Sequence, residues 1–238
     1  MKKTVFLLLC SVVLVSSVSY AGLFDSIFKS SGSSSSTGLD ESTTISGLKE
    51  ALAIGTENAV QNVSQVDGYF GNSLIKILMP EKIQNVADVL GKLGFQKEVD
   101  EFVLSMNRAA EKAAPEAASI FGDAIREMTI QDAVGILNGG DTAATDFFEE
   151  KTHDRLYGAF KPIISSSMDE VGATKSYKNM MGRYETIPFM DKRSLDLDHY
   201  VTDKSLDGLF YMVGQEEKKI RTDPAARVTD LLQTVFGK

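Results

Sequence analysis

The fold class is decided by the stretch Glu98-Val-Asp-Glu-Phe-Val-Leu-Ser-Met-Asn-Arg-Ala-Ala-Glu-Lys-Ala-Ala114, which Pro115 follows directly. Apolar residues recur along it at spacings of three and four, the period of an amphipathic α-helix. Because proline disfavours the helical conformation of the residue before it, we expect this helix to end at Ala114. The next segment, residues 115–128, has the same period and predicts a second helix.

The helical period continues on both sides of this stretch. It predicts further helices at residues 46–63, 80–93, 131–137, 141–171, 173–184, 195–221 and 224–236, with Thr129 as the cap of the third and a possible bend at Pro162. Residues 72–79 are apolar and short, and periodicity leaves open an extended piece or a single helical turn. Because β-alternation and hairpin dipeptides are nearly absent, we expect an all-α fold.

The N-terminus has the three parts of a cleavable signal peptide. Met1-Lys2-Lys3 is positively charged, residues 5–15 are apolar, and Ser19-Tyr20-Ala21 places small residues at a cleavage point before Gly22. Residues 1–21 are therefore predicted to be removed on export, which places the protein in the periplasm. A lipoprotein signal at Cys10 is the alternative, but bulky Leu9 precedes it. The other alternative, an uncleaved anchor, needs about 20 apolar residues.

Export changes the composition. The chain has 238 residues, 25 of them basic and 33 acidic; cleavage removes two basic residues and no acidic ones, so the net charge falls from −8 to −10. A negative surface disfavours nucleic acid and anionic lipid as partners. Cleavage also removes Cys10, the only cysteine, so the mature chain would be held together by its core without a disulfide.

The predicted domains follow from these patterns. Residues 46–238 are expected to form a single-domain multi-helix bundle, and residues 22–45 a flexible N-terminal extension. The extension combines a small amphipathic patch with a Ser- and Gly-rich linker. We interpret the patch as a loosely docked or disordered tail, or as a hook for weak contact with a membrane surface or partner. Its apolar residues are Leu23, Phe24, Ile27 and Phe28.

The turn before the predicted 141–171 helix is the first candidate binding site. Two glycines there permit unusual backbone angles, and we expect a positive φ at this dipeptide. The N–H groups of the following helix would attract an anion. The alternative is that Asp141 or Thr142 caps the helix itself, and an acidic cap would repel an incoming anion. The candidate residues of this turn are Gly139, Gly140, Asp141, Thr142 and Thr145.

Two other polar groups are weaker candidates. Asn107, Arg108 and Glu111 lie one turn apart on a helix with a buried face, and we expect them to close hydrogen bonds to loops or to form an ion pair. A polar lining for a small cavity is the functional alternative. Asp223 is expected to cap a helix that Pro224 begins, with Arg227 one turn later able to pair with an acid.

Neither metal nor nucleophilic chemistry has a convincing pattern. Glu150-Lys-Thr-His153 has the spacing of di-iron bundles, but such sites need a second Glu-x-x-His motif and two further glutamates. The other histidine lies in Asp196-Leu-Asp-His199, so we interpret Asp146, Glu149, Glu150 and His153 as a solvated face. No Gly-x-Ser-x-Gly elbow is present. We therefore expect no cofactor and assign no catalytic or metal-binding residue.

Several motifs resemble one bacterial family, domain-of-unknown-function family 4197. The resemblance covers about residues 46–236 and implies an exported helical protein without an assigned activity. The motifs are Gly47-Leu-Lys-Glu-Ala-Leu-Ala-Ile-Gly-Thr-Glu57, Met106-Asn-Arg-Ala-Ala-Glu111 with Pro115-Glu116, Ile136-Leu-Asn-Gly-Gly-Asp-Thr-Ala-Ala-Thr-Asp-Phe-Phe148, Tyr200-Val-Thr-Asp-Lys-Ser-Leu-Asp-Gly-Leu-Phe210 and Asp223-Pro-Ala-Ala-Arg227.

Together these patterns favour a non-catalytic envelope protein that binds either a hydrophobic ligand or an envelope protein partner. Its methionines would suit an adaptable pocket, although methionines also fill ordinary cores. They are Met79, Met106, Met128, Met168, Met180 and Met181. The alternative is a periplasmic hydrolase or metal-dependent enzyme that uses acids near the Gly139–Gly140 turn.

The signal peptide generates the first testable prediction. We expect the exported protein to begin at Gly22 and to carry no lipid, because the Ser19-Tyr20-Ala21 site is well formed and Cys10 lies in a poor context. The intact mass of protein purified from the periplasm measures this directly. A species that begins at Cys10 with the added mass of a diacylglyceryl group would contradict it.

Overall fold

The computed structural model describes residues 41–170, 175, 177–179, 181–182 and 196–236. Helices dominate this part of the chain, and no strand occurs in it, which confirms the all-α prediction. None of its helices is both long enough and apolar enough to cross a membrane. The signal peptide, the amphipathic patch and linker, and much of the helix predicted at 173–184 lie outside the described residues.

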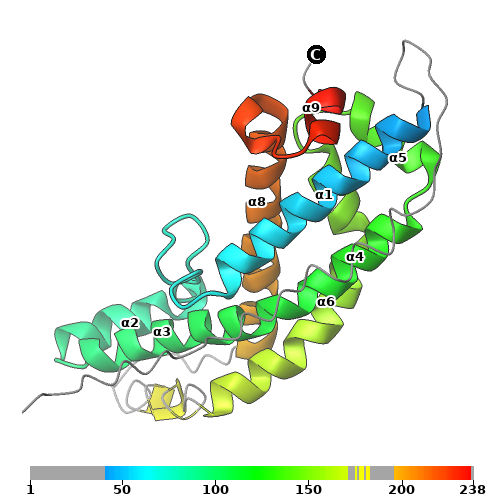
Figure 1. Ribbon diagram of the computed structural model, residues 1–238. Coiled ribbons are helices and arrows are strands. Elements are labelled where there is room, and N and C mark those ends of the chain that lie inside the picture. Colours follow the sequence, from blue (N-terminus) through cyan, green and yellow to red (C-terminus); the bar gives the residue numbers. More distant parts are fainter. Residues whose placement is uncertain (1–40, 171–174, 176, 180, 183–195, 237–238) are drawn as a thin grey trace, which may run out of the picture. The chain divides into compact units, whose positions relative to one another are not determined.

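Three consecutive elements form one nearly continuous rod (Figure 1). They are α3 (Gln96–Ala113), the 3₁₀ turn η2 (Ala114–Glu116) and α4 (Ala117–Glu127). Pro115 stands in the first turn of η2, where the N–H that proline lacks is not needed for a helical hydrogen bond. The α-helix therefore ends before Pro115 as predicted, within one residue, but the chain continues in the same direction.

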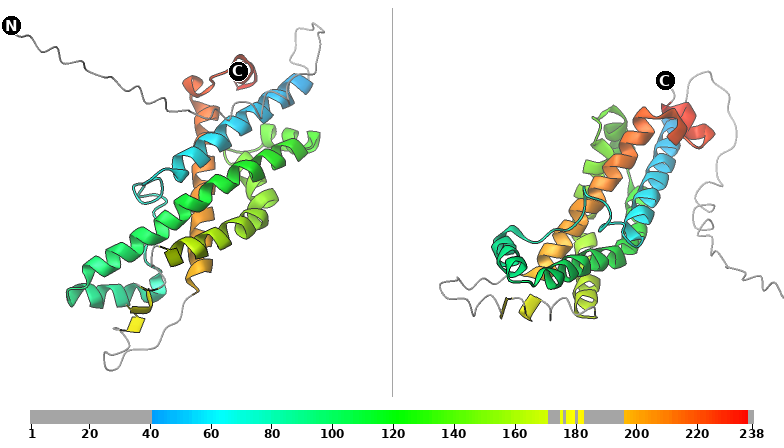
Figure 2. Two further views of the ribbon diagram at one scale, coloured as in Figure 1. Left: turned by 60° about the horizontal axis from the view of Figure 1, so that its bottom comes forward. Right: turned by 90° about the vertical axis from the view of Figure 1, so that its left-hand side faces the viewer.

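Three long helices pack around this rod. The helix α6 (Ala143–Glu170) contacts α3, α4 and α8 (Leu197–Thr222), while α1 (Glu41–Ser64) contacts both α4 and α8. Figure 2 shows α1 and α8 side by side. Pro162 lies inside α6 without ending it. The core between these helices includes the fully buried side chains of Phe102, Phe121, Phe148, Phe160 and Leu156.

Short helices complete the arrangement. The helix α2 (Glu81–Lys92) packs on α3 and is followed by Gly94, whose φ of +88° suits glycine. The helix α5 (Ile130–Asn138) begins with the predicted cap Thr129, which forms a capping box with Asp132.

The C-terminal end departs from the prediction. The single helix predicted at 224–236 is interrupted: η3 (Pro224–Ala226) and α9 (Asp230–Phe236) are separate, and α9 packs on α1. Hydrogen bonds from Arg227 to the carbonyls of Ile220 and Arg221 turn the chain back onto the end of α8, which explains the break.

The loop at residues 65–80 joins α1 to α2. Asp67, with a φ of +67°, and Gly68 end the α1 pattern as expected from the sequence. Of the two interpretations left open for residues 72–79, the single helical turn is present, because the Lys76 N–H donates to the Asn72 carbonyl at 2.8 Å; residues 76–80 follow without helix or turn. In this segment side chains alternate: Ile75, Ile77 and Met79 are buried, whereas Leu74 and Leu78 are exposed.

The packing of this loop on α8 generates a stability prediction. A Cβ atom on Gly208 would lie 2.7 Å from Tyr69 Cε1 and 3.2 Å from Ile75 Cβ. We therefore expect Gly208→Ala to lower the free energy of unfolding by about 1–3 kcal/mol, because both neighbours are buried. Gly158→Ala in α6 is the matched control, since nothing lies within 4 Å of its added Cβ and alanine favours helices. Denaturant unfolding that gives equal stabilities for the two variants would contradict this account.

Candidate functional site

A buried carboxylate occupies the N-terminus of α6. Glu217, on α8, accepts a hydrogen bond from the Ala144 N–H at 3.0 Å and one from the Thr145 N–H at 2.9 Å. The Thr145 hydroxyl donates a third at 2.8 Å. These are N–H groups that the first turn of a helix leaves without an intrahelical partner. The positive end of the α6 dipole also favours a negative charge here.

Arg221 completes this arrangement one turn further along α8. Its Nε and Nη2 atoms donate to Glu217 Oε1 at 2.9 and 2.8 Å, and Nη2 also donates to the Ile136 carbonyl at 3.1 Å. The ion pair thus joins α8 both to the start of α6 and to the end of α5. Sequence reasoning missed both residues, because they lie in an ordinary charged run, Gln215-Glu-Glu-Lys-Lys-Ile-Arg221.

The anion that was one of two interpretations of the Gly139–Thr145 turn is therefore a side chain of the protein itself. The prediction that Asp141 or Thr142 caps this helix was wrong. Glu217 accepts from the N–H groups of Ala144 and Thr145. Asp141 and Thr142 are exposed, and the Thr142 hydroxyl donates to Asp146. The expected positive φ was also wrong. Gly139 has a φ of −81°, and Gly94 is the glycine with a positive φ in the described part of the chain.

Gly139 has a different steric role in this turn. A Cβ there would lie 2.4 Å from the Cβ of Ala143, whereas a Cβ on Gly140 would meet nothing within 4 Å. The turn needs a small residue at Gly139 because the chain passes close to the start of α6. It places no such demand on Gly140.

A small cavity lies beside Glu217 and Arg221. Its volume is about 30 Å³, and most of its lining is apolar, with Leu52, Phe148 and Val213 among the contributors. One water needs about 10–15 Å³, so this space holds at most a few waters and no lipid chain. The methionines proposed for an adaptable pocket pack instead in the core: Met79, Met106, Met128, Met168 and Met181 are buried there, and Met180 lies outside the described residues.

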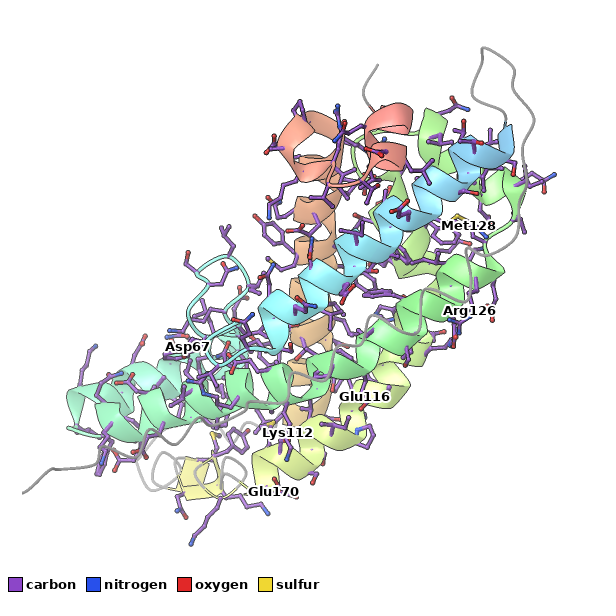
Figure 3. All side chains as sticks on the ribbon, viewed as in Figure 1. Asp67, Lys112, Glu116, Arg126, Met128 and Glu170 are labelled. Atoms are coloured by element: carbon purple, nitrogen blue, oxygen red, sulfur yellow. The ribbon has the colours of Figure 1, made fainter. Side chains whose placement is uncertain are left out.

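A second buried carboxylate holds the loop at residues 65–80. Glu111 Oε1 accepts hydrogen bonds from the N–H groups of Tyr69 and Phe70 at 3.1 and 3.2 Å. Arg108 donates to Glu111 Oε2 and to Asp67 Oδ1, each at 2.6 Å. The hydrogen bond to Glu111 raises the pKa of Arg108 above its usual value. Figure 3 shows Asp67 between the end of α1 and α3.

Two further anchors hold the same loop. The side-chain amide of Asn107 accepts from the Ile77 N–H and donates to the Ile77 carbonyl, both at 2.8 Å. Tyr69 is fully buried and donates to the Ser205 carbonyl at 2.7 Å. Burial, together with the Glu111 charge, raises the pKa of Tyr69 far above its usual value. The structural role predicted for Asn107, Arg108 and Glu111, hydrogen bonding to a loop with an ion pair, is confirmed.

The anchored loop exposes aliphatic side chains. Val66, Leu74 and Leu78 are 77%, 70% and 61% exposed. Between this loop, α1 and α8 lies a groove of about 460 Å³, which is lined by Asn62, Gln65, Val66, Asp67, Gly68, Gly71, Asn72 and Met212. The sequence contained one signal of this surface, the alternation within residues 74–79 that periodicity alone did not resolve.

The other candidates lie apart from this surface. Asp223 accepts from the Ala225 N–H, as expected for a cap, but Arg227 binds carbonyl oxygens where an acidic partner was predicted. His153 lies beside Asp154, and His199 contacts Tyr157 and Asp203. In the described part of the chain, no three His, Cys, Asp or Glu side chains are grouped to hold a metal ion.

A family described as "Protein of unknown function (DUF4197)" matches residues 38–237. No curated protein and no solved structure matches the chain.

The Glu217 network generates a prediction about stability. We expect Glu217→Ala to lower the free energy of unfolding by about 3–5 kcal/mol, because it leaves two helix N–H groups and the Arg221 charge without their partner. Glu149→Ala is the control, at an exposed site on α6, the helix whose N-terminus Glu217 occupies. It should change the free energy of unfolding by less than about 0.5 kcal/mol. Denaturant titrations of both variants measure the difference, and a Glu217→Ala protein as stable as the parent would refute the assigned role.

Proposed function

This chain belongs to the DUF4197 family, and we propose that it is an exported, non-catalytic protein of the cell envelope that binds a protein partner. The binding surface would be the loop at residues 65–80 together with its adjoining groove. The observation that carries the proposal is that this loop exposes aliphatic side chains while buried hydrogen bonds hold its backbone in place.

The anchoring of the loop backbone matters because ordering a loop on binding costs conformational entropy. Here Glu111 holds the backbone at Tyr69 and Phe70, and Asn107 holds it at Ile77. These anchors bracket Leu74, so much of the ordering is complete before a partner arrives. Binding residues are commonly carried by loops that a rigid scaffold positions.

The exposed residues are unusual in being close together in the chain. Single exposed aliphatic residues are normal on protein surfaces and need no explanation. Val66, Leu74 and Leu78, however, lie on one short segment whose other aliphatic side chains, Ile75 and Ile77, are buried. Transfer of such side chains from water into an interface favours association.

A protein partner is better supported than a hydrophobic small molecule. Ligand pockets usually have volumes of about 300–1,000 Å³. The apolar cavity beside Glu217 has only about 30 Å³, and the larger groove is mainly polar in its lining residues. Export to the periplasm is part of the proposal, and the signal-peptide features of residues 1–21 support it.

The second function suggested by the sequence, a hydrolase or metal-dependent enzyme built on acids near the Gly139–Gly140 turn, has less support. The carboxylate that reaches this turn, Glu217, already accepts from two backbone N–H groups, one hydroxyl and Arg221. A general base needs a free lone pair directed at a substrate proton. Glu217 instead serves to hold three helices together.

Photo-crosslinking in the native host tests the proposed surface. We expect p-benzoyl-phenylalanine at Leu74 or Leu78 to capture one defined envelope protein, because both side chains project from the anchored loop. The matched control is Leu93, which is 57% exposed at the turn between α2 and α3. Adding Val66→Ser should reduce capture at Leu74. No captured species, or the same species from Leu93, would contradict the proposal.

A further inference from the structure

We infer that the groove beside the loop binds an extended, uncharged segment of polypeptide through paired hydrogen bonds between side-chain amides and the peptide backbone. This inference rests on the proposed function and names the chemistry that the partner would present. It concerns the groove between the end of α1, the loop and Met212 of α8.

The lining of the groove is rich in amides. Asn62 comes from the last turn of α1, Gln65 directly follows that helix, and Asn72 comes from the loop. An amide side chain carries both a donor and an acceptor without a charge. Asp67, the charged residue among the lining residues, is ion-paired with Arg108 at 2.6 Å, and Glu111 shares the same guanidinium. With this acid paired and no basic residue among the described lining residues, the groove matches a peptide group better than a phosphate or carboxylate.

Part of this hydrogen-bonding capacity is unused. Asn72 accepts from the Leu74 N–H at 3.1 Å, and its nitrogen lies 3.6 Å from the Met212 sulfur. Within the described residues, the side-chain amides of Asn62 and Gln65 have no hydrogen-bond partner in the protein. Their exposed positions at the end of α1 and just after it leave these donors and acceptors available to an incoming chain.

The same fold already contains the proposed interaction. Asn107 binds both backbone groups of Ile77, its oxygen accepting from the N–H and its nitrogen donating to the carbonyl, at 2.8 Å each. Ile77 lies in residues 76–80, which form no helix or turn and in which buried Ile77 and Met79 flank exposed Leu78. An amide side chain in this protein therefore already binds a non-helical stretch of backbone in the way that we infer for Asn62 and Gln65.

The size and rim of the groove fit such a segment. A volume of about 460 Å³ lies within the usual range for ligand sites and accommodates a few residues of an extended chain. Val66 at the rim offers an aliphatic contact for a side chain of that segment. Among the described residues, no lysine or arginine lines the groove, which disfavours nucleic acid and other polyanions.

A peptide library is the probe for this inference. Random 12-residue peptides would be selected on the full mature chain, and the affinity of the best one measured by titration. We expect Asn62→Ala with Gln65→Ala to weaken binding by about tenfold or more, since the paired hydrogen bonds of both amides are lost. The matched control is Gln84→Ala with Asn85→Ala, an exposed amide pair on α2, which should leave the affinity unchanged.

Backbone chemistry distinguishes the proposed mode from side-chain recognition. Replacing central N–H groups of the selected peptide by N-methyl groups should weaken binding to the parent protein but have little further effect on the Asn62/Gln65 variant. Equal binding of the peptide to parent and variant would overturn the inference, as would failure to select any peptide. Competition by a neutral oligosaccharide such as chitotetraose, lost in the same variant, would reassign the groove to sugars.

These outcomes separate the groove from the loop. If crosslinking at Leu74 captures a partner while the Asn62/Gln65 variant binds peptides normally, the groove inference fails and the proposed function stands. If peptides bind in the groove while Leu74 and Leu78 capture nothing, the peptide-binding groove stands and the assignment of the loop fails. Thermal melts of every variant check that the substitutions at exposed positions leave the fold intact.

Discussion

Two buried carboxylates, Glu111 and Glu217, satisfy backbone N–H groups that helix packing removes from water. Each accepts from two consecutive backbone N–H groups, Tyr69 and Phe70 for Glu111, and Ala144 and Thr145 for Glu217. Each is also paired with an arginine on its own helix, three or four residues away. A buried charge is tolerated only when it is paired and hydrogen-bonded, so each network is stable as a unit. The Glu111 network connects α3 to the loop at residues 65–80, and the Glu217 network connects α8 to α5 and α6.

This use of polar residues bears on function. Two groups of residues look like an active site in the sequence. They are the Gly139–Gly140 turn and the set Asn107, Arg108 and Glu111, and both form structural hydrogen bonds. Their buried atoms hold helices and one loop in place. The surface that remains for recognition lies on that loop and in the groove next to it, where aliphatic side chains and amides face solvent.

The candidate site was only partly predictable. Asn107, Arg108 and Glu111 were found because three polar residues on a helix with a buried face imply partners for buried polar groups. Glu217 was missed because its partners, Ala144 and Thr145, lie more than 70 residues away and its own neighbours are charged. The break before α9 was missed for a similar reason: Arg227 finds its carbonyl partners only after the chain turns back on α8.

The sequence by itself determined the all-α class, most helix boundaries and the caps at Thr129 and Asp223, because periodicity and capping depend on residues within a few positions of each other. Tertiary structure alone decided which acid would fill the N-terminus of α6, and how residues 72–79 would divide between a turn and a segment without helix or turn. Each of these outcomes depends on a helix distant in sequence: α8 for Glu217, and α3 for the Asn107 that holds Ile77. Local patterns carry no information about such partners, because the hydrogen bonds exist only after the helices have packed.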